Sequence, residues 1–482
     1  MWALASIAVI IYVTLRIVKN PEELPIYAFI LSSTLPAIVM GNWFAYGVKG
    51  DSIRFEYVVF ILGVFLAFFS KKHRPPSRGV VGRAVLAMLL VNVATIFVSI
   101  YWRTKMGIGT TIRLLETYMF YFIVVRLTQR RHIAGLLNAL ITVTAAISGL
   151  FVVISVTNSR FLIRLINPPT LDVFSRAKVF EGNFFGDKIS MVLTMYFVTP
   201  IMGAVTFFLA LVKKKERFYY ALLSLLFLVH TALSGERGYA LMLLAGLLAS
   251  VAALYLAGGG MKAGYRAAAI IICAASALYC LYAYTGFFGD RTQYMVSRLE
   301  KARAEQQSRD MLMGQVHAKE ELSEGGAPAW IAGFGGYRKS RIAGIRRFQG
   351  GSTGYDVNGP ILMILRYGVT GLAAIVILLL LAFRRTFSML RRLPMTAEEN
   401  AVVFGVLLWI VMVSLSSAFR GFEFSENFTF LSCFVILLGW SEVIWRDYGI
   451  ARLNDGFAQG PAMVGCRTRA SYGLRGDSGI CR

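Results

Sequence analysis

Arginines lie inside or at the ends of long apolar runs in this sequence, where a charge is costly. Arg237 begins one such run, Arg366 lies one to two turns inside another, and Arg420 ends a third. A charge at the centre of a membrane-spanning helix costs roughly 2.5 kcal/mol or more, so such residues usually face a polar cavity. Snorkelling explains Arg237 or Arg420 equally well, but it explains Arg366 less easily. Converging guanidinium groups would suit phosphate or diphosphate, which arginine binds through paired hydrogen bonds.

Two carboxylates accompany these arginines. Glu236 directly precedes Arg237, and Asp356 lies shortly before the run that contains Arg366. Either could act as a general base toward an acceptor hydroxyl. Glu236 could equally be the ion-pair partner that orients Arg237, and Asp356 could equally cap a helix or form a turn. Both alternatives stay open from the sequence.

The composition excludes an ordinary soluble enzyme. Of the 482 residues, 57% are hydrophobic and only 16% are charged, whereas soluble domains are about 45–50% apolar and about 25% charged. Five Cys are too few for a disulfide scaffold. With four His and no Cys-x-x-Cys, no metal site is predicted. The chain is expected to be an all-α, polytopic transmembrane helical bundle.

Stretches of about 20 mostly apolar residues predict the helices that cross the membrane. The first candidate is short and begins at Met1, and the fifth carries Arg113 and Glu116, so about 12–13 spans are expected. The candidates cover 2–18, 25–47, 56–70, 84–101, 111–127, 134–157, 190–212, 218–235, 238–257, 266–286, 360–383, 400–419 and 427–445.

Lys and Arg in the short loops predict the orientation of these spans. One set of alternate loops carries twenty of them and the opposite set carries seven. The first set is therefore expected to be cytoplasmic, with the C-terminus inside and the two longest loops outside. Most of the net charge of +24 belongs to these cytoplasmic segments, so it gives no support to nucleic-acid binding.

The chain divides accordingly into six segments. Within the larger external loop, 291–326 is expected to be a charged helix, either solvated or lying as a lid on the outer membrane surface. Gly333-Phe334-Gly335-Gly336 follows it and is interpreted as a flexible turn with its backbone close to substrate. The segments are N-terminal spans (1–157), an external loop (158–189), central spans (190–286), a large external loop (287–359), C-terminal spans (360–445) and a disordered cytoplasmic tail (446–482).

Four stretches, in order, resemble the bacterial O-antigen polymerase/ligase superfamily of membrane glycosyltransferases. They are Arg176–Phe184, Leu233–Gly238, Gly333–Gly336 and Asn358–Gly371. The second is similar to the family's Ser-Gly-x-Arg-Gly at the outer end of a helix, and the fourth is similar to its last loop-to-helix stretch. Ligases of the family typically carry His-Asn there, whereas Val357 precedes Asn358 here. This departure favours polymerase over ligase.

The resemblance implies a glycan polymerase at the outer face of the bacterial inner membrane. It would transfer a growing polysaccharide from undecaprenyl diphosphate to the next lipid-linked repeat, without cofactor or metal. Its implied partners are this lipid-linked glycan, membrane lipid, a polysaccharide chain-length regulator and a flippase, and no nucleic acid. The predicted site residues are Arg176, Arg237, Arg366 and Arg420 for diphosphate binding, Gly335, Arg338 and Asn358 for substrate positioning, and Glu236 and Asp356 for catalysis.

Other functions remain as alternatives. A ligase would move finished glycan to a lipid A core or another acceptor. A lipid-linked sugar flippase would need polar groups along a path through both leaflets, whereas the ionisable residues singled out here concentrate at the outer end. A structural role has no feature in its favour beyond hydrophobicity.

Overall fold

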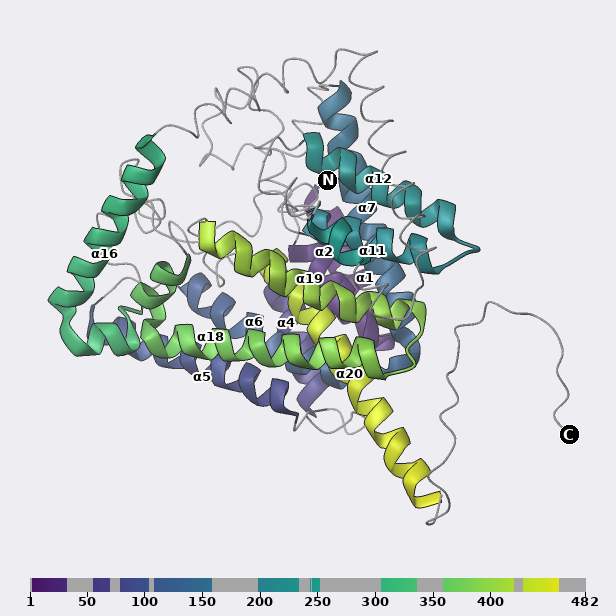
Figure 1. The fold of residues 1–482 in the computed structure, drawn as a ribbon. Coiled ribbons are helices and arrows are strands. Elements are labelled where there is room, and N and C mark those ends of the chain that lie inside the picture. The colour runs from purple at the N-terminus through teal and green to yellow at the C-terminus, as the bar shows by residue number, and fades with distance from the viewer. Residues whose placement is uncertain are drawn as a thin grey trace, which may run out of the picture.

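The computed structural model describes residues 2–32, 55–69, 79–103, 108–157, 198–233, 243, 245–251, 305–335, 359–419 and 428–458. All regular structure in these ranges is helical, so the predicted all-α architecture is confirmed (Figure 1). The longer helices are α1 (Trp2–Lys19), α2 (Leu24–Ser32), α4 (Phe55–Phe69), α5 (Val80–Tyr101), α6 (Ile108–Leu127), α7 (Ile133–Thr157), α11 (Val198–Val212), α12 (Arg217–Leu233), α16 (Glu305–Ala332), α18 (Gly359–Arg392), α19 (Ala397–Phe419) and α20 (Phe428–Ala458).

Helices occupy every predicted span for which the structure describes residues, and the predicted span at 266–286 lies outside them. The chain has the helices of a multi-pass membrane protein. Helix α1 confirms that the first candidate span is helical, whereas its crossing of the membrane stays a prediction. In the described part of the chain, four helices are long and apolar enough to cross a membrane, namely Val80–Tyr101, Arg130–Val153, Gly359–Arg392 and Ala397–Ser414.

Helix α11 is buried along nearly its whole length. Every residue from Val198 to Leu211 is buried, and the helix packs against α7, α12 and α19. A helix that is apolar on all sides must be surrounded, and here neighbouring helices surround it. Ser224 on α12 donates a hydrogen bond of 3.0 Å to Gly203 O on α11. Hydroxyl-to-backbone bonds of this kind join apolar helices where the hydrophobic effect between them is weak.

Helices α5 and α18 lie side by side (Figure 1). Both carry exposed apolar side chains. On α5, Leu86, Leu90, Phe97 and Ile100 are each at least 45% exposed. They are separated by four, seven and three residues, which are helical repeat spacings, so they share one face of the helix. An apolar face of this extent would promote aggregation in water. It is the surface that a lipid-facing helix requires.

Glycines interrupt both α16 and α18. Helix α16 is broken at Gly326, with φ 64° and ψ −160°, and α18 is broken at Gly368, with φ 68° and ψ −175°. The charged helix predicted over 291–326 is confirmed where the structure describes it, but it resumes after the break and ends at Ala332. Pro328 permits this because it lies in the first turn of the second segment, where a proline removes no intrahelical hydrogen bond.

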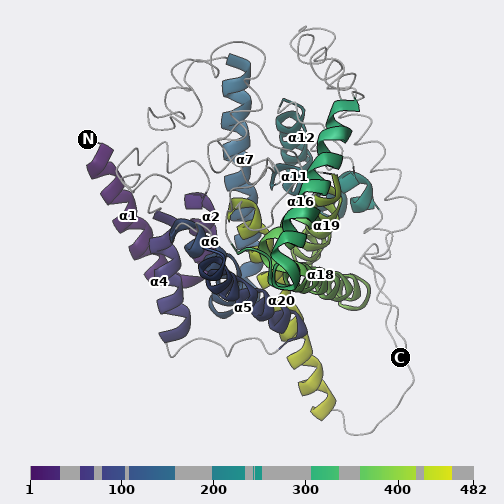
Figure 2. The same ribbon diagram turned by 90° about the vertical axis from the view of Figure 1, so that its left-hand side faces the viewer.

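The end of α16 and the start of α18 share a small hydrophobic cluster, separate from the main core. Figure 2 shows α16 crossing in front of α18, which is seen nearly end-on. The second segment of α16 is therefore anchored to the first segment of α18 by packing as well as by backbone contacts. The buried members of the cluster are Ala318, Leu322, Ala329, Phe334, Leu362 and Leu365.

Helix α20 extends to Ala458, into the segment for which the sequence predicted a disordered tail. Its distal half projects from the bundle (Figure 1). Tyr448 provides an anchor, because its hydroxyl donates to Pro394 O and its ring lies 3.9 Å from the guanidinium carbon of Arg130. These contacts stabilise the part of α20 around Tyr448, where hydropathy alone predicts no helix. The rest of the predicted tail lies outside the described residues.

Candidate functional site

Arg366 is a predicted site residue that the structure places inside the protein. It lies two residues before the break in α18 and is only 6% exposed. Its guanidinium carbon lies 5.4 Å from the ring centroid of Tyr367, within cation–π distance. Because a charge buried in a membrane helix is costly, Arg366 requires polar surroundings that an unbroken apolar helix would not supply.

The break at Gly368 leaves carbonyl groups of α18 without their usual donors one turn further along. The segment after α16 supplies replacements. The N–H of Phe334 donates to Leu365 O at 2.8 Å, and the N–H of Gly335 donates to Arg366 O at 3.0 Å. Backbone groups at membrane depth must be satisfied by protein, since lipid offers no partner. The loop therefore stabilises the broken conformation of the helix that carries Arg366.

Two glycines allow this close approach. A Cβ on Gly335 would lie 2.5 Å from Ser99 N on α5, and a Cβ on Gly368 would lie 2.0 Å from Ile331 O on α16. Both residues have a positive φ, 75° for Gly335 and 68° for Gly368, which residues other than glycine rarely adopt. Gly335 is therefore buried and hydrogen-bonded, whereas its nearness to substrate stays a prediction. It is wedged between α5 and α18, and we call this contact region the α5–α16–α18 junction.

Arg103 follows Trp102, which contacts the junction, and the sequence interpretation did not select it. It ends the turn after α5 with φ 50°, the one positive φ of a non-glycine residue in the described ranges. The preceding Trp102 packs edge-on against Phe334, with 5.2 Å between ring centroids. Arg103 was visible in the sequence as a basic residue in a predicted external loop, but its strained backbone and the packing of its neighbour Trp102 on Phe334 were not.

The structure brings together two of the predicted site residues, Arg366 and Gly335, through the hydrogen bond from Gly335 N–H to Arg366 O. The proposed roles of all nine site residues stay predictions, and no contact of the other seven is described. The predicted site residues outside the described ranges are Arg176, Glu236, Arg237, Arg338, Asp356, Asn358 and Arg420.

The groups at the junction suit an anion better than a metal ion. The guanidinium of Arg366 is buried there, and Arg103 next to Trp102 is exposed. The rings of Trp102 and Phe334 pack on each other. In the part of the chain that the structure describes, no three His, Cys, Asp or Glu side chains gather as a metal site would require. A phosphate-bearing ligand is the chemistry that these side chains fit.

Known proteins give no family for this chain, since no protein-family model and no curated protein matches its sequence.

Proposed function

We propose that the chain is a membrane glycosyltransferase that polymerises glycan from an undecaprenyl-diphosphate-linked donor. The growing polysaccharide would pass to the next lipid-linked repeat at the outer face of the bacterial inner membrane. The observation that carries the proposal is the buried Arg366 at the break in α18, held by the segment Gly333–Gly335. These residues belong to the third and fourth of the stretches that resemble the O-antigen polymerase/ligase superfamily, and they meet in space.

The proposed reaction needs negative charge to be stabilised on a departing diphosphate. The acceptor hydroxyl oxygen forms a bond to the anomeric carbon, while the bond from that carbon to the diphosphate oxygen breaks. The electron pair leaves with the diphosphate, and the hydroxyl proton passes to a carboxylate, for which Asp356 and Glu236 are the candidates. Guanidinium groups fixed in a partly dry site stabilise the leaving group without reorganisation. Arg366 is proposed for that role because it is a buried guanidinium, with Arg176, Arg237 and Arg420 as its proposed partners.

A ligase is the principal alternative, and deleting the gene distinguishes the two. Lipid-linked intermediates from the deletion strain would be separated by size on a gel. Accumulation of single repeats is the result expected of a polymerase. Accumulation of full-length lipid-linked polymer would identify a ligase, and an unchanged pattern would exclude both functions.

Variants of Arg366 then test the site itself in the deletion strain. Arg366→Gln removes the charge and should abolish long glycan, while Arg366→Lys keeps the charge but loses the paired hydrogen bonds and should restore only short chains. Arg384→Gln is the matched control, because Arg384 is an exposed arginine toward the other end of α18. The assignment fails if Arg366→Gln supports the same chain-length ladder as the control while the protein level in the membrane is equal.

A further inference from the structure

A pocket of about 490 Å³ lies near the end of α18 opposite to Arg366. It is formed where the short helical turn Arg130–His132, the turn after α18 and helix α20 meet. At a rise of 1.5 Å per residue, the stretch of α18 from Gly368 to Arg392 places this pocket roughly 35 Å from the proposed glycosyl-transfer site. The polar residues that line it are Gln129, Arg130, Arg131, Thr396, Glu399 and Asp447.

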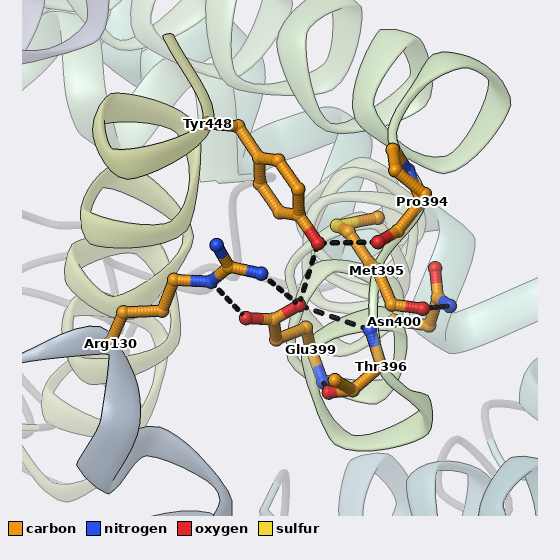
Figure 3. Close-up of polar contacts among 7 residues, drawn as sticks. All are labelled: Arg130, Pro394, Met395, Thr396, Glu399, Asn400 and Tyr448. Carbon is orange, nitrogen blue, oxygen red and sulfur yellow. Dashed lines mark hydrogen bonds and ion pairs between the residues drawn. The ribbon is translucent and has the colours of Figure 1, made fainter. Parts of the chain in front are cut away.

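Arg130 and Glu399 neutralise each other in this pocket (Figure 3). The guanidinium donates from Nε to Oε1 at 2.5 Å and from a terminal nitrogen to Oε2 at 3.2 Å. Oε2 also accepts from the backbone N–H of Thr396 at 3.0 Å and lies 3.2 Å from the Tyr448 hydroxyl. The side chain of Glu399 is only 8% exposed. This carboxylate is thus fully engaged and offers little to a bound molecule.

Apart from this pair, the pocket is lined by one acid, Asp447, and one base, Arg131. Asp447 lies 3.7 Å from Arg446, which compensates its charge. Arg131 is exposed, and among the residues with described positions it has no ion pair. Gln129 beside it is also exposed. With both acids compensated, the available groups are one guanidinium and one side-chain amide, which are donors to an oxyanion.

The pocket also lies at the ends of two candidate membrane spans, which is where lipid headgroups would be expected. Arg130 begins the candidate membrane span Arg130–Val153, and Glu399 lies in the first turn of the span Ala397–Ser414. Basic pockets between membrane helices at this level bind lipid phosphates. The volume of about 490 Å³ exceeds what a bare carboxylate would fill and leaves room for a phosphate with its substituents.

We propose that this pocket binds a phosphate group, with Arg131 as its main ligand and Gln129 as a second donor. The Arg130–Glu399 pair forms the rigid wall that positions them. A phospholipid headgroup and a soluble phosphate share this chemistry, so binding to each is measured separately. The site is independent of the proposed glycosyl transfer, because it uses other residues at the other end of α18.

The test uses the full-length protein, purified in detergent. Native mass spectrometry would count retained phosphatidylglycerol, and calorimetry would measure binding of inorganic phosphate. Arg131→Ala should weaken binding of at least one probe about tenfold, the effect expected from losing a charge-assisted hydrogen bond. Lys214→Ala is the matched control, because Lys214 is an exposed basic residue of the turn between α11 and α12. Loss for phosphatidylglycerol alone identifies a lipid site, and loss for inorganic phosphate alone identifies a soluble anion.

Two results would overturn the proposal. Arg131→Ala could bind both probes as the wild type does, or Lys214→Ala could weaken binding as much as Arg131→Ala does, which would indicate general surface charge. Gln129→Ala provides a second variant that leaves all charges in place. It should weaken the same probe as Arg131→Ala, to a smaller extent, and an unchanged affinity would exclude Gln129 as a ligand. Circular dichroism melting curves check that each variant is folded.

Discussion

Arg103 combines strain, charge and position in one residue. Its φ of 50° lies in the left-handed region, where a residue with a Cβ costs roughly 1–2 kcal/mol. Its side chain is exposed, and no ion pair joins it to the described residues. It follows Trp102, which packs on Phe334 of the junction. Because backbone strain persists where the surroundings or the function require it, we expect Arg103 to help bind the donor diphosphate.

Replacing Arg103 by Gly and by Ala separates the strain from the charge. Both changes remove the guanidinium, so both should shorten the glycan made in the deletion strain. Only Gly should also relieve the strain, so its free energy of unfolding should exceed that of Arg103→Ala by about 1 kcal/mol. Thermal unfolding and the sizing gel measure the two effects. Full-length glycan from both variants would rule out a role for Arg103 in binding.

At the scale of elements, the attachment of α16 to α18 depends on glycine at the junction. Gly335→Ala adds a Cβ 2.5 Å from Ser99 N and also strains a residue with φ 75°. Gly326→Ala is the matched control, because it strains a residue with φ 64° but meets no atom nearer than 3.9 Å. The overpacking should therefore cost Gly335→Ala about 1–3 kcal/mol more in free energy of unfolding than the control.

Limited proteolysis gives a second measurement of the same contact. Gly335→Ala should expose α16 to cleavage faster than Gly326→Ala, because it displaces the segment that joins α16 to α5 and α18. Equal unfolding energies and equal cleavage rates would show that the junction does not depend on this approach.

Local sequence patterns predict the helices of this chain well and the junction poorly. Hydropathy over about 20 residues is a local property, so α5, α18 and α19 lie where their apolar runs predict them. The hydrogen bond from Gly335 N–H to Arg366 O joins residues far apart in sequence. It depends on which carbonyls the break at Gly368 leaves without donors, and no periodicity encodes that. A charge in an apolar run is itself a local signal, so the sequence singled out Arg366, but not the contacts around it.

At the scale of the whole molecule, two consecutive acids at the start of α19 join this helix to two turns elsewhere in the chain. Glu398 pairs with Lys213 of the turn between α11 and α12 at 2.6 Å, and Glu399 pairs with Arg130 of the turn before α7. Burial works to lower the pKa of Lys213, but hydrogen bonds with Glu398 and Glu216 outweigh it and raise the pKa above its ordinary 10.5. The hydrogen bond with Lys213 lowers the pKa of Glu216 below its ordinary 4.5.

These shifts predict how the stability supplied by Lys213 depends on pH. A raised lysine pKa gives stability that is complete below about pH 10.5 and is lost as the pH rises past it. A lowered glutamate pKa gives stability that is complete above about pH 4.5 and is lost as the pH falls past it. Lys213→Met should therefore cost up to about 1 kcal/mol, constant between these limits and smaller outside them, as measured by denaturant unfolding. A cost that grows above pH 10.5 would contradict the pairing.

The orientation of the whole chain decides whether the junction faces outward. Helix α5 has 22 residues and is therefore about 33 Å long, enough to cross a hydrocarbon core of about 30 Å. Its ends, near Arg83 and Arg103, must then lie on opposite sides of the membrane. The distribution of Lys and Arg predicts that Arg83 lies on the cytoplasmic side and Arg103 outside. The same prediction puts Lys214 and Arg391, at the ends of other helices, on the side of Arg83.

Cysteine labelling tests this orientation in a chain whose five native Cys are replaced by Ser. Arg103→Cys should react with a membrane-impermeant maleimide in intact spheroplasts, because it lies at the predicted outer end of α5. Lys214→Cys and Arg391→Cys should react only after the membrane is permeabilised. The reverse pattern would place Arg366 and the junction at the cytoplasmic end of α18, where a glycan exported on undecaprenyl diphosphate could not reach them. The proposed polymerase would then be excluded, while the phosphate pocket at the other end of α18 would be unaffected.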